Sequence, residues 1–221
     1  MSAAPKPSRG YVPSLGFPWL TPFYDVVVAA TSRERTFKDA LIRQASLRPG
    51  DQVLDLASGT GTLTVRLKQC APGAAVTGVD GDASVLTRAR AKAANAGVAV
   101  QFDQALSWSL PYADGRFDCA VSSLFFHHLD WEAKQRTTRE LFRVLKSGGQ
   151  LHVADWGRPA NFLLRGLFYP VQWLDGFPTT RDNVAGRLPE LFRGAGFTLV
   201  TEERTFSTIY GTMALYRATR P

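Results

Sequence analysis

The chain has 221 residues, a formal net charge of +7 and a hydrophobic content of 45%. This length is sufficient for one α/β domain with a full core and short for two domains of ordinary size. No run approaches the roughly 20 uncharged apolar residues of a membrane-spanning helix, so we expect a soluble protein. The lysines and arginines are scattered among acidic residues, so the positive charge by itself does not indicate nucleic-acid binding.

The N-terminal residues indicate neither a targeting signal nor a disulfide-rich module. Residues 1–20 contain four prolines and few periodic apolar positions, which predicts a mobile arm in front of the domain. The start lacks the apolar segment of a signal peptide, so we expect a cytoplasmic protein. Cys70 and Cys119 stand far apart, which suggests neither a disulfide framework nor a metal site.

From residue 21 onward, strands and helices alternate along the sequence. Apolar residues at helical spacing predict a helical segment between residues 22 and 47. The predicted strands that follow are 52–57, 75–79, 99–102, 117–122 and 150–154, with helices between them that include 83–96 and 131–145 and a loop at 146–149. Two last runs, 198–202 and 208–216, are expected to pair antiparallel through a connection at 203–206. The alternation predicts a parallel sheet in a single domain over 21–221.

An unusually aromatic segment interrupts this regularity between residues 161 and 177. It can be a helix packed on the edge of the sheet, the wall or lid of a substrate pocket, or a contact with a membrane surface. We expect residues 157–180 to form an insertion or lid on the substrate side.

The strongest functional signal is the sequence VLDLASGTG at residues 53–61. Glycines at a strand-to-helix turn let the backbone approach a ligand and expose its amide groups. Asp80 ends the second strand, where a carboxylate can accept both hydroxyl groups of a ribose or, alternatively, cap the next helix. Thr64 stands where an NAD-binding turn needs a third glycine, so NAD is disfavoured.

Four blocks, at residues 53–64, 76–82, 110–118 and 143–151, resemble class I methyltransferases, specifically the methyltransferase type 11 and ubiquinone/menaquinone-biosynthesis group. The resemblance implies a Rossmann-like α/β sandwich. Its seven-stranded sheet is mostly parallel with the last strand antiparallel, and helices cover both faces. It also implies that S-adenosyl-L-methionine binds at the carboxyl ends of the first two strands.

The resemblance places the methionine part of this cofactor at residues 55–61, the ribose at Asp80 and the adenine beside Gly81. Relatives carry an acidic or amide motif where this chain has Leu106 and Ser107. Adenine recognition therefore falls to the Ser107 backbone or hydroxyl, with Trp108 stacking on the base. The expected cofactor contacts are Asp55, Ala57, Ser58, Gly59, Thr60, Gly61, Asp80, Gly81, Leu106, Ser107, Trp108 and Ser123.

Two histidines, His127 and His128, follow the fourth strand. Quinone-modifying relatives have an arginine and an asparagine at these positions, a difference that argues against a quinone acceptor. Imidazole titrates near neutral pH, so His127 is our candidate catalytic base, although both histidines can instead be packing residues. The expected substrate contacts are Tyr24, His127, His128, Trp156, Phe168 and Trp173, and we expect no metal ion.

These observations predict a methyltransferase for a small hydrophobic or aromatic molecule, because the aromatic segment offers apolar pocket walls. The alternative is a phospholipid or lipid-quinone methyltransferase that is peripheral to a membrane, where positive charge would meet an anionic bilayer. An RNA methyltransferase is disfavoured, because no Asn/Asp-Pro-Pro-Tyr motif follows the fourth strand. A non-catalytic binding protein is disfavoured because the glycine turn and Asp80 are intact.

Overall fold

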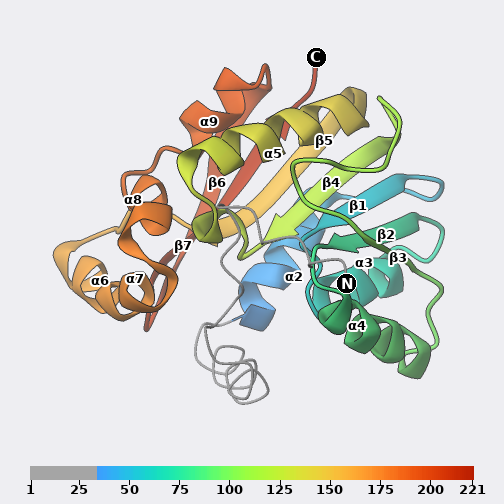
Figure 1. The fold of residues 1–221 in the computed structure, drawn as a ribbon, viewed down its shortest axis with the longest axis horizontal. Helices are drawn as coiled ribbons and strands as arrows, with labels where there is room; N and C mark the ends of the chain where they lie inside the picture. Colours follow the sequence, from blue (N-terminus) through green and yellow to red (C-terminus); the bar gives the residue numbers. More distant parts are fainter. Residues whose placement is uncertain (1–33) are drawn as a thin grey trace, which may run out of the picture.

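The computed structural model describes residues 34–221, and in that part of the chain seven strands form one sheet (Figure 1). The strands are β1 (Gln52–Leu56), β2 (Ala75–Asp80), β3 (Gln101–Gln104), β4 (Phe117–Ser123), β5 (Leu145–Trp156), β6 (Thr198–Thr208) and β7 (Gly211–Thr219). Their order is β3-β2-β1-β4-β5-β7-β6. Strand β7 runs antiparallel to β5 and β6, and the other pairs are parallel. The predicted Rossmann-like sheet with an antiparallel last strand is confirmed.

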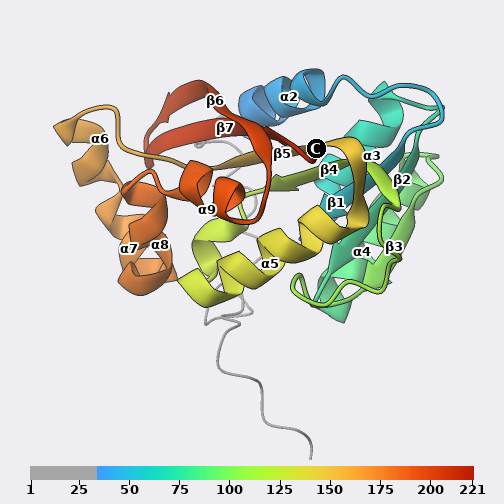
Figure 2. The ribbon, with the colours of Figure 1, turned by 90° about the horizontal axis from the view of Figure 1, so that it is seen from above.

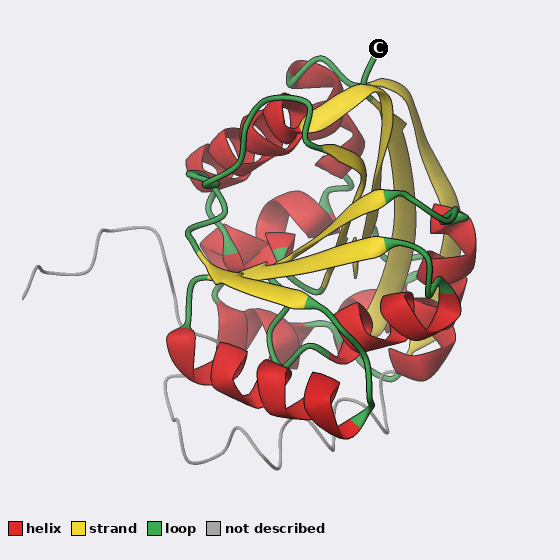
Figure 3. Ribbon diagram, turned by 90° about the vertical axis from the view of Figure 1, so that its right-hand side faces the viewer, coloured by secondary structure: helices red, strands yellow, loops and turns green. Residues whose placement is uncertain are grey.

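Helices cover both faces of this sheet, as predicted (Figures 2 and 3). They are α2 (Glu34–Ala45), α3 (Thr62–Cys70), α4 (Ala83–Asn95), α5 (Trp131–Val144), α6 (Phe162–Leu167), α7 (Tyr169–Asp175), α8 (Phe177–Val184) and α9 (Leu188–Gly194), with a 3₁₀ turn, η2 (Phe126–His128). Within residues 34–221, no helix has the length and apolar character that a bilayer span requires.

Strand β1 is buried on both faces. Val53 belongs to the core cluster that includes Leu41 of α2 and Leu67 of α3. The next residue, Leu54, points to the opposite face and belongs to the cluster that includes Leu141 of α5. Burial on both faces explains why the strand is a continuous apolar run rather than an alternating one.

The structure corrects the predicted bounds of several elements. Strand β3 begins two residues later than expected, and β5 begins at Leu145, so the predicted loop 146–149 is part of this strand. The Gly148 amide donates to the Arg220 carbonyl and the Arg220 amide donates to the Gly149 carbonyl, and these two bonds tie the start of the strand to the C-terminal end of the chain. Strand β6 continues to Thr208, and the turn lies at 209–210 rather than at 203–206. The charged residues that suggested a loop lie on an edge strand, where charge is tolerated.

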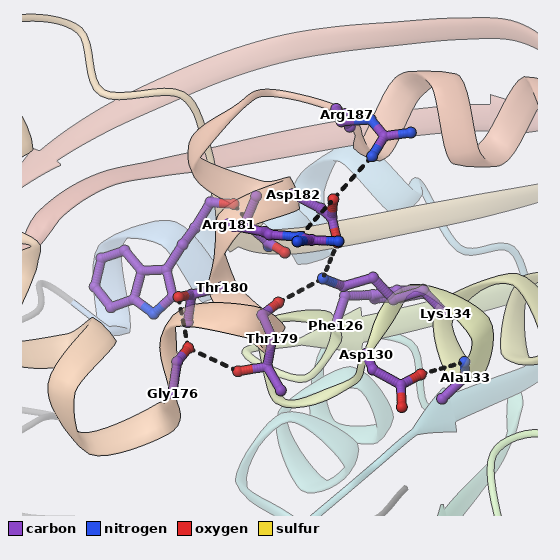
Figure 4. Close-up of polar contacts among 12 residues, drawn as sticks. Phe126, Asp130, Ala133, Lys134, Gly176, Thr179, Thr180, Arg181, Asp182 and Arg187 are labelled. Atoms are coloured by element: carbon purple, nitrogen blue, oxygen red, sulfur yellow. Dashed lines mark hydrogen bonds and ion pairs between the residues drawn. The ribbon is translucent and has the colours of Figure 1, made fainter.

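The segment between β5 and α9 forms three short helices at one end of the sheet (Figure 1). A buried lysine fixes it to α5 (Figure 4): Lys134 Nζ donates to the Thr179 carbonyl at 2.6 Å and lies 3.6 Å from the Asp182 carboxylate. Arg187 approaches the same carboxylate at 3.0 Å. Removing one partner of a buried ion pair costs about 3–5 kcal/mol, so loss of Lys134 or Asp182 would disturb the contact between α5 and α8.

Gly61 illustrates how the turn after β1 is fitted to its neighbours. Its φ is +74°, in the left-handed region, and an added Cβ would lie 2.9 Å from Ala89 Cβ of α4. Gly97 has a similar φ of +64°, but nothing lies within 4 Å of its added Cβ.

We therefore expect Gly61→Ala to lower the free energy of unfolding more than Gly97→Ala does. Both variants lose about 1–2 kcal/mol to the left-handed backbone, and overpacking against Ala89 adds about 1–3 kcal/mol in Gly61→Ala only. Urea denaturation of both variants measures the difference. Equal losses would show that close packing at Gly61 contributes nothing.

Candidate active site

A cavity of about 960 Å³ lies at the carboxyl ends of β1, β2, β4 and β5. In parallel α/β sheets, the loops at this edge diverge and leave room for ligands. The volume is at the upper end of the roughly 300–1,000 Å³ typical of ligand pockets, so the cavity has room for more than one small molecule.

The turn after β1 forms one wall of this cavity. Ala57 and Gly59 have φ values of +57° and +51°, and both line the cavity. A left-handed conformation is costly for alanine and is kept where the surrounding structure or a function requires it. Among residues 34–221, no atom lies within 4 Å of an added Cβ at Gly59, so this glycine leaves open space in the described part of the chain.

Asp80 joins the end of β2 to this turn. Its Oδ2 accepts a hydrogen bond from the Gly59 amide at 2.8 Å, and its Oδ1 accepts one from the Asp82 amide at 3.0 Å. Helix α4 is capped instead by Asp82, which accepts from the Ser84 amide at 2.7 Å. Asp80 is therefore not a helix cap. Burial raises the pKa of its carboxyl above the ordinary value, while the two amides oppose that rise.

The cavity collects most of the side chains that the sequence assigned to a cofactor. Those that line it are Ala57, Ser58, Gly59, Thr60, Asp80, Gly81, Leu106, Ser107, Trp108 and Ser123. Within residues 34–221, the buried hydroxyls of Ser58 and Ser123 have no hydrogen-bond partner. An unpaired buried hydroxyl costs about 1–3 kcal/mol, so these two groups favour a polar ligand in the cavity.

Two of the assigned residues lie behind the cavity wall. Asp55 is 1% exposed and accepts a hydrogen bond from the Thr64 hydroxyl at 2.6 Å. Burial raises the pKa of Asp55 to about 7. Gly61 packs on α4, as described above. Neither residue lines the cavity, because β1 and the start of α3 turn them toward the core; their contribution to binding is to shape the turn.

After β3, the cavity wall includes Leu106, Ser107 and Trp108, whereas the glycine turn offers only small residues. Leu106 is 41% exposed, whereas Ser107 is buried, and its hydroxyl shares a 2.8 Å hydrogen bond with the Thr137 hydroxyl. One face of the Trp108 ring carries the Arg136 guanidinium, 5.4 Å from the ring centroid. A cation over an indole is a stabilising contact that helps to hold the ring in place.

On the other side of the cavity, His127 is held by a buried carboxylate. His127 Nδ1 lies 2.7 Å from Asp155 Oδ1, and both side chains are almost fully buried. Burial by itself would lower the pKa of His127, but the Asp155 and Asp175 carboxylates raise it above its usual value. Burial would likewise raise the pKa of Asp155, and His127 lowers it. An ionised Asp155 accepts a hydrogen bond from Nδ1–H, so Nε2 is the ring nitrogen that a ligand in the cavity can meet.

Asp175, at the end of α7, approaches both histidines. Its carboxylate lies 3.6 Å from His127 Nε2 and 3.8 Å from His128 Nδ1. Burial raises the pKa of Asp175, and burial together with His127 lowers the pKa of His128 to about 3. His128 is therefore a neutral imidazole at pH 7.

The remaining residues assigned to the substrate are not all in the cavity. Trp156 lines it, and Phe168 is buried behind Trp156 with ring centroids 5.3 Å apart. Trp173 is 83% exposed and does not line the cavity, because Pro170, Val171 and Leu174 occupy the cavity side of α7. The expected pocket wall is therefore corrected: in α7 it consists of Pro170, Val171 and Leu174 rather than Trp173. Tyr24 lies outside the described residues.

Asp155 and Asp175 were missed in the sequence. Asp155 follows the predicted strand 150–154 directly, as Asp80 ends β2, so the same signal of a carboxylate at the end of a buried strand was available. Asp175 had no such signal, because only the folding of α6 and α7 brings it to the histidines. His152, the third histidine, is buried in β5 and contacts Gln44 and Gln150, away from the cavity.

The sequence profile of the methyltransferase domain family matches residues 53–149. Over 190 residues, the chain is 34% identical to a demethylmenaquinone methyltransferase of Thermus thermophilus, with 77% of this chain and 83% of the relative covered. The chain belongs to the class I S-adenosylmethionine-dependent methyltransferases, in the ubiquinone/menaquinone-biosynthesis group. It is an enzyme, and its cofactor is S-adenosylmethionine.

Solved structures with lower sequence identity share the fold of this methyltransferase. A putative methyltransferase from Bacillus halodurans is 21% identical and superposes with a TM-score of 0.68, covering 83% of this chain and 98% of its own. The S-adenosylmethionine-dependent methyltransferase SibL is also 21% identical, with a TM-score of 0.73 over 98% of this chain and 64% of its own. The chain therefore shares its fold with these two proteins.

The residues of the cavity fit this cofactor. S-adenosylmethionine carries ribose hydroxyls, an amino group and a carboxylate. The cavity offers it the Asp80 carboxylate and the unpaired hydroxyls of Ser58 and Ser123.

We expect Asp80→Asn to weaken S-adenosylhomocysteine binding by about 1.5–3 kcal/mol, or roughly 10- to 150-fold, because one acceptor oxygen and the charge are lost. Calorimetry measures the affinity. Asp118→Asn is the matched control, because Asp118 also accepts a backbone amide, that of Gln52 at 2.8 Å, and does not line the cavity. Equal affinity in the two variants would reject a cofactor contact at Asp80.

Proposed function

We propose that this methyltransferase methylates a small hydrophobic or aromatic acceptor that carries an ionisable hydroxyl group. The observation that carries the proposal is the buried pair of His127 and Asp155, 2.7 Å apart, of which His127 lines the cavity just after β4. A base in this position suits an acceptor that reacts better after it loses a proton. Apolar residues around it, including Trp156 and Leu174, suit an aromatic body.

In this proposal the cofactor contacts divide among the turns of the sheet. Asp80 accepts hydrogen bonds from the ribose hydroxyls, and Gly81, Leu106, Ser107 and Trp108 border the adenine. The methionine end is held by Ser123 and by the turn that runs from Asp55 to Gly61. The Ser107 hydroxyl is engaged with Thr137, so its backbone amide is the better candidate for recognising the base.

The acceptor side of the proposal consists of His127, His128 and Trp156. S-adenosylmethionine supplies a methyl group already activated by its sulfonium, so the protein mainly aligns the acceptor and excludes water. His127 Nε2 accepts the hydroxyl proton, while Asp155 holds the ring and stabilises its positive charge. The inserted segment 157–180 contributes Pro170, Val171 and Leu174 of α7 to the cavity wall, which supports its expected role as a substrate-side lid.

A lipid-quinone acceptor at a membrane surface is the second candidate. The Thermus relative is named a demethylmenaquinone methyltransferase. Two apolar side chains of the inserted helices are largely exposed: Phe162 of α6 at 90% and Trp173 of α7 at 83%. Helix α7 also lines the cavity, and its Leu174 is both a lining residue and 61% exposed, so this helix joins the exposed surface to the cavity.

The direct test is methyl transfer from labelled S-adenosylmethionine to a panel of phenols, hydroquinones, amines, thiols and phospholipids. The proposal expects hydroxylated aromatic acceptors to be methylated fastest. Transfer confined to amines or thiols would contradict it.

We expect His127→Ala to lower kcat on a phenolic acceptor by about 10²- to 10⁴-fold near neutral pH, the usual contribution of a general base. The loss should shrink above the pKa of the acceptor, where the hydroxyl ionises unaided. His152→Gln is the control, since this histidine lies away from the cavity. A loss that is the same at every pH would mean that His127 only positions the acceptor.

We expect Leu174→Ala to raise the acceptor KM about three- to tenfold through lost apolar contact, and Trp173→Ala to leave the KM for a dissolved acceptor within about twofold. Activity on an acceptor embedded in vesicles distinguishes the two candidates. If the acceptor is taken from a membrane, Trp173→Ala reduces activity on vesicles only. Equal behaviour of Trp173→Ala and wild type on vesicles would count against the second candidate.

A further inference from the structure

We propose that His127, His128 and Asp175 form a binding site for a divalent transition-metal ion at the acceptor side of the cavity. The two histidines end η2, and Asp175 ends α7. One possible ligand atom from each residue lies within 4.8 Å of the other two. This inference extends the proposed function and depends on it for the position of the acceptor in the cavity.

The spacing of the three groups suits a shared ion better than direct hydrogen bonds. The carboxylate of Asp175 is 3.6 Å from His127 Nε2 and 3.8 Å from His128 Nδ1. Nitrogen-to-oxygen hydrogen bonds are about 2.7–3.2 Å long. Two ligands bound about 2.1 Å from one ion lie roughly 3.0–3.4 Å apart, which small side-chain rotations reach from the observed distances.

The groups also lack other partners. The Asp175 side chain is 7% exposed, yet no hydrogen bond within residues 34–221 reaches its carboxylate. The imidazole of His128 likewise receives none from the described part of the chain. Two imidazoles at 3.6 and 3.8 Å only partly offset the cost of burying this carboxylate, and a bound cation would offset more of it.

His127 has the partner that a metal ligand needs. Asp155 accepts a hydrogen bond from Nδ1–H at 2.7 Å, which fixes the ring and places Nε2 on the side of Asp175. Carboxylate–histidine–metal arrangements of this kind orient the ligand and raise its basicity.

The chemistry of the three ligands restricts the ion. Two imidazole nitrogens and one carboxylate suit Zn²⁺, Fe²⁺ or Co²⁺, whereas Mg²⁺ and Ca²⁺ prefer oxygen ligands only. Three protein ligands leave coordination positions open. His127, His128 and Leu174 line the cavity, so an acceptor oxygen would reach a bound ion from there. With the ion bound, His127 Nε2 would be a ligand and not a base; the acceptor hydroxyl would release its proton to water, and the ion would stabilise the oxygen anion that remains.

The test uses the full chain, stripped of metal with a chelator, and Co²⁺ as the probe. We expect calorimetry and visible absorption to report one Co²⁺ per chain. Asp175→Asn and His128→Gln should each weaken the affinity at least tenfold, and Asp155→Asn about 10- to 100-fold, the usual effect of losing such a supporting carboxylate. His152→Gln is the matched control and should bind as wild type does, with circular dichroism confirming that all variants fold.

Absence of stoichiometric Co²⁺ binding would overturn the site. Equal Co²⁺ affinity in Asp175→Asn and His152→Gln would also overturn it, because the ion would then bind elsewhere as an adventitious ion only. The titration contains neither cofactor nor acceptor, so its failure leaves the methyl-transfer results standing. Conversely, normal Co²⁺ binding by an enzyme that methylates only amines or thiols would reject the proposed function and leave the metal site standing.

Discussion

The acceptor side of the cavity depends on one buried carboxylate, that of Asp155. It accepts hydrogen bonds from the amides of Phe125 and Phe126 at 3.1 and 2.7 Å and from His127 Nδ1 at 2.7 Å. Asn183 of α8 donates to it as well, at 3.3 Å. A fully buried charge is tolerated only with such partners. The same charge therefore shapes the turn after β4, orients His127 and ties the inserted helices to the end of β5.

Asp80 has a corresponding role on the cofactor side. Each acid ends or follows a buried strand, and each binds the backbone amides of a neighbouring turn, Gly59 for Asp80 and Phe126 for Asp155. A carboxylate has more acceptor positions than these amides use, so it can organise a turn and still meet a ligand or a histidine. In the proposed function, Asp80 therefore marks the cofactor side of the cavity and Asp155 the acceptor side.

Local signals explain what could be predicted from the sequence. The apolar strands, the glycine turn and Asp80 lie within single strand–turn–helix units, so their arrangement follows from short-range pattern. In the aromatic segment, the sequence did not show which side chains of a helix would face the cavity. We expected Trp173 to face it, but Trp173 is exposed and its neighbour Leu174 lines the cavity. Asp175 meets His127 only because three short helices fold back over the sheet, and no spacing in the sequence encodes that contact.

The most direct test of this division is a crystal structure of the enzyme with S-adenosylhomocysteine bound. We expect the ribose hydroxyls to contact Asp80, the amino-acid end to lie along the Ser58–Gly61 turn, and the sulfur to face the open space beside His127. A ribose away from Asp80, or a sulfur on the side opposite His127, would contradict the proposed division of the cavity.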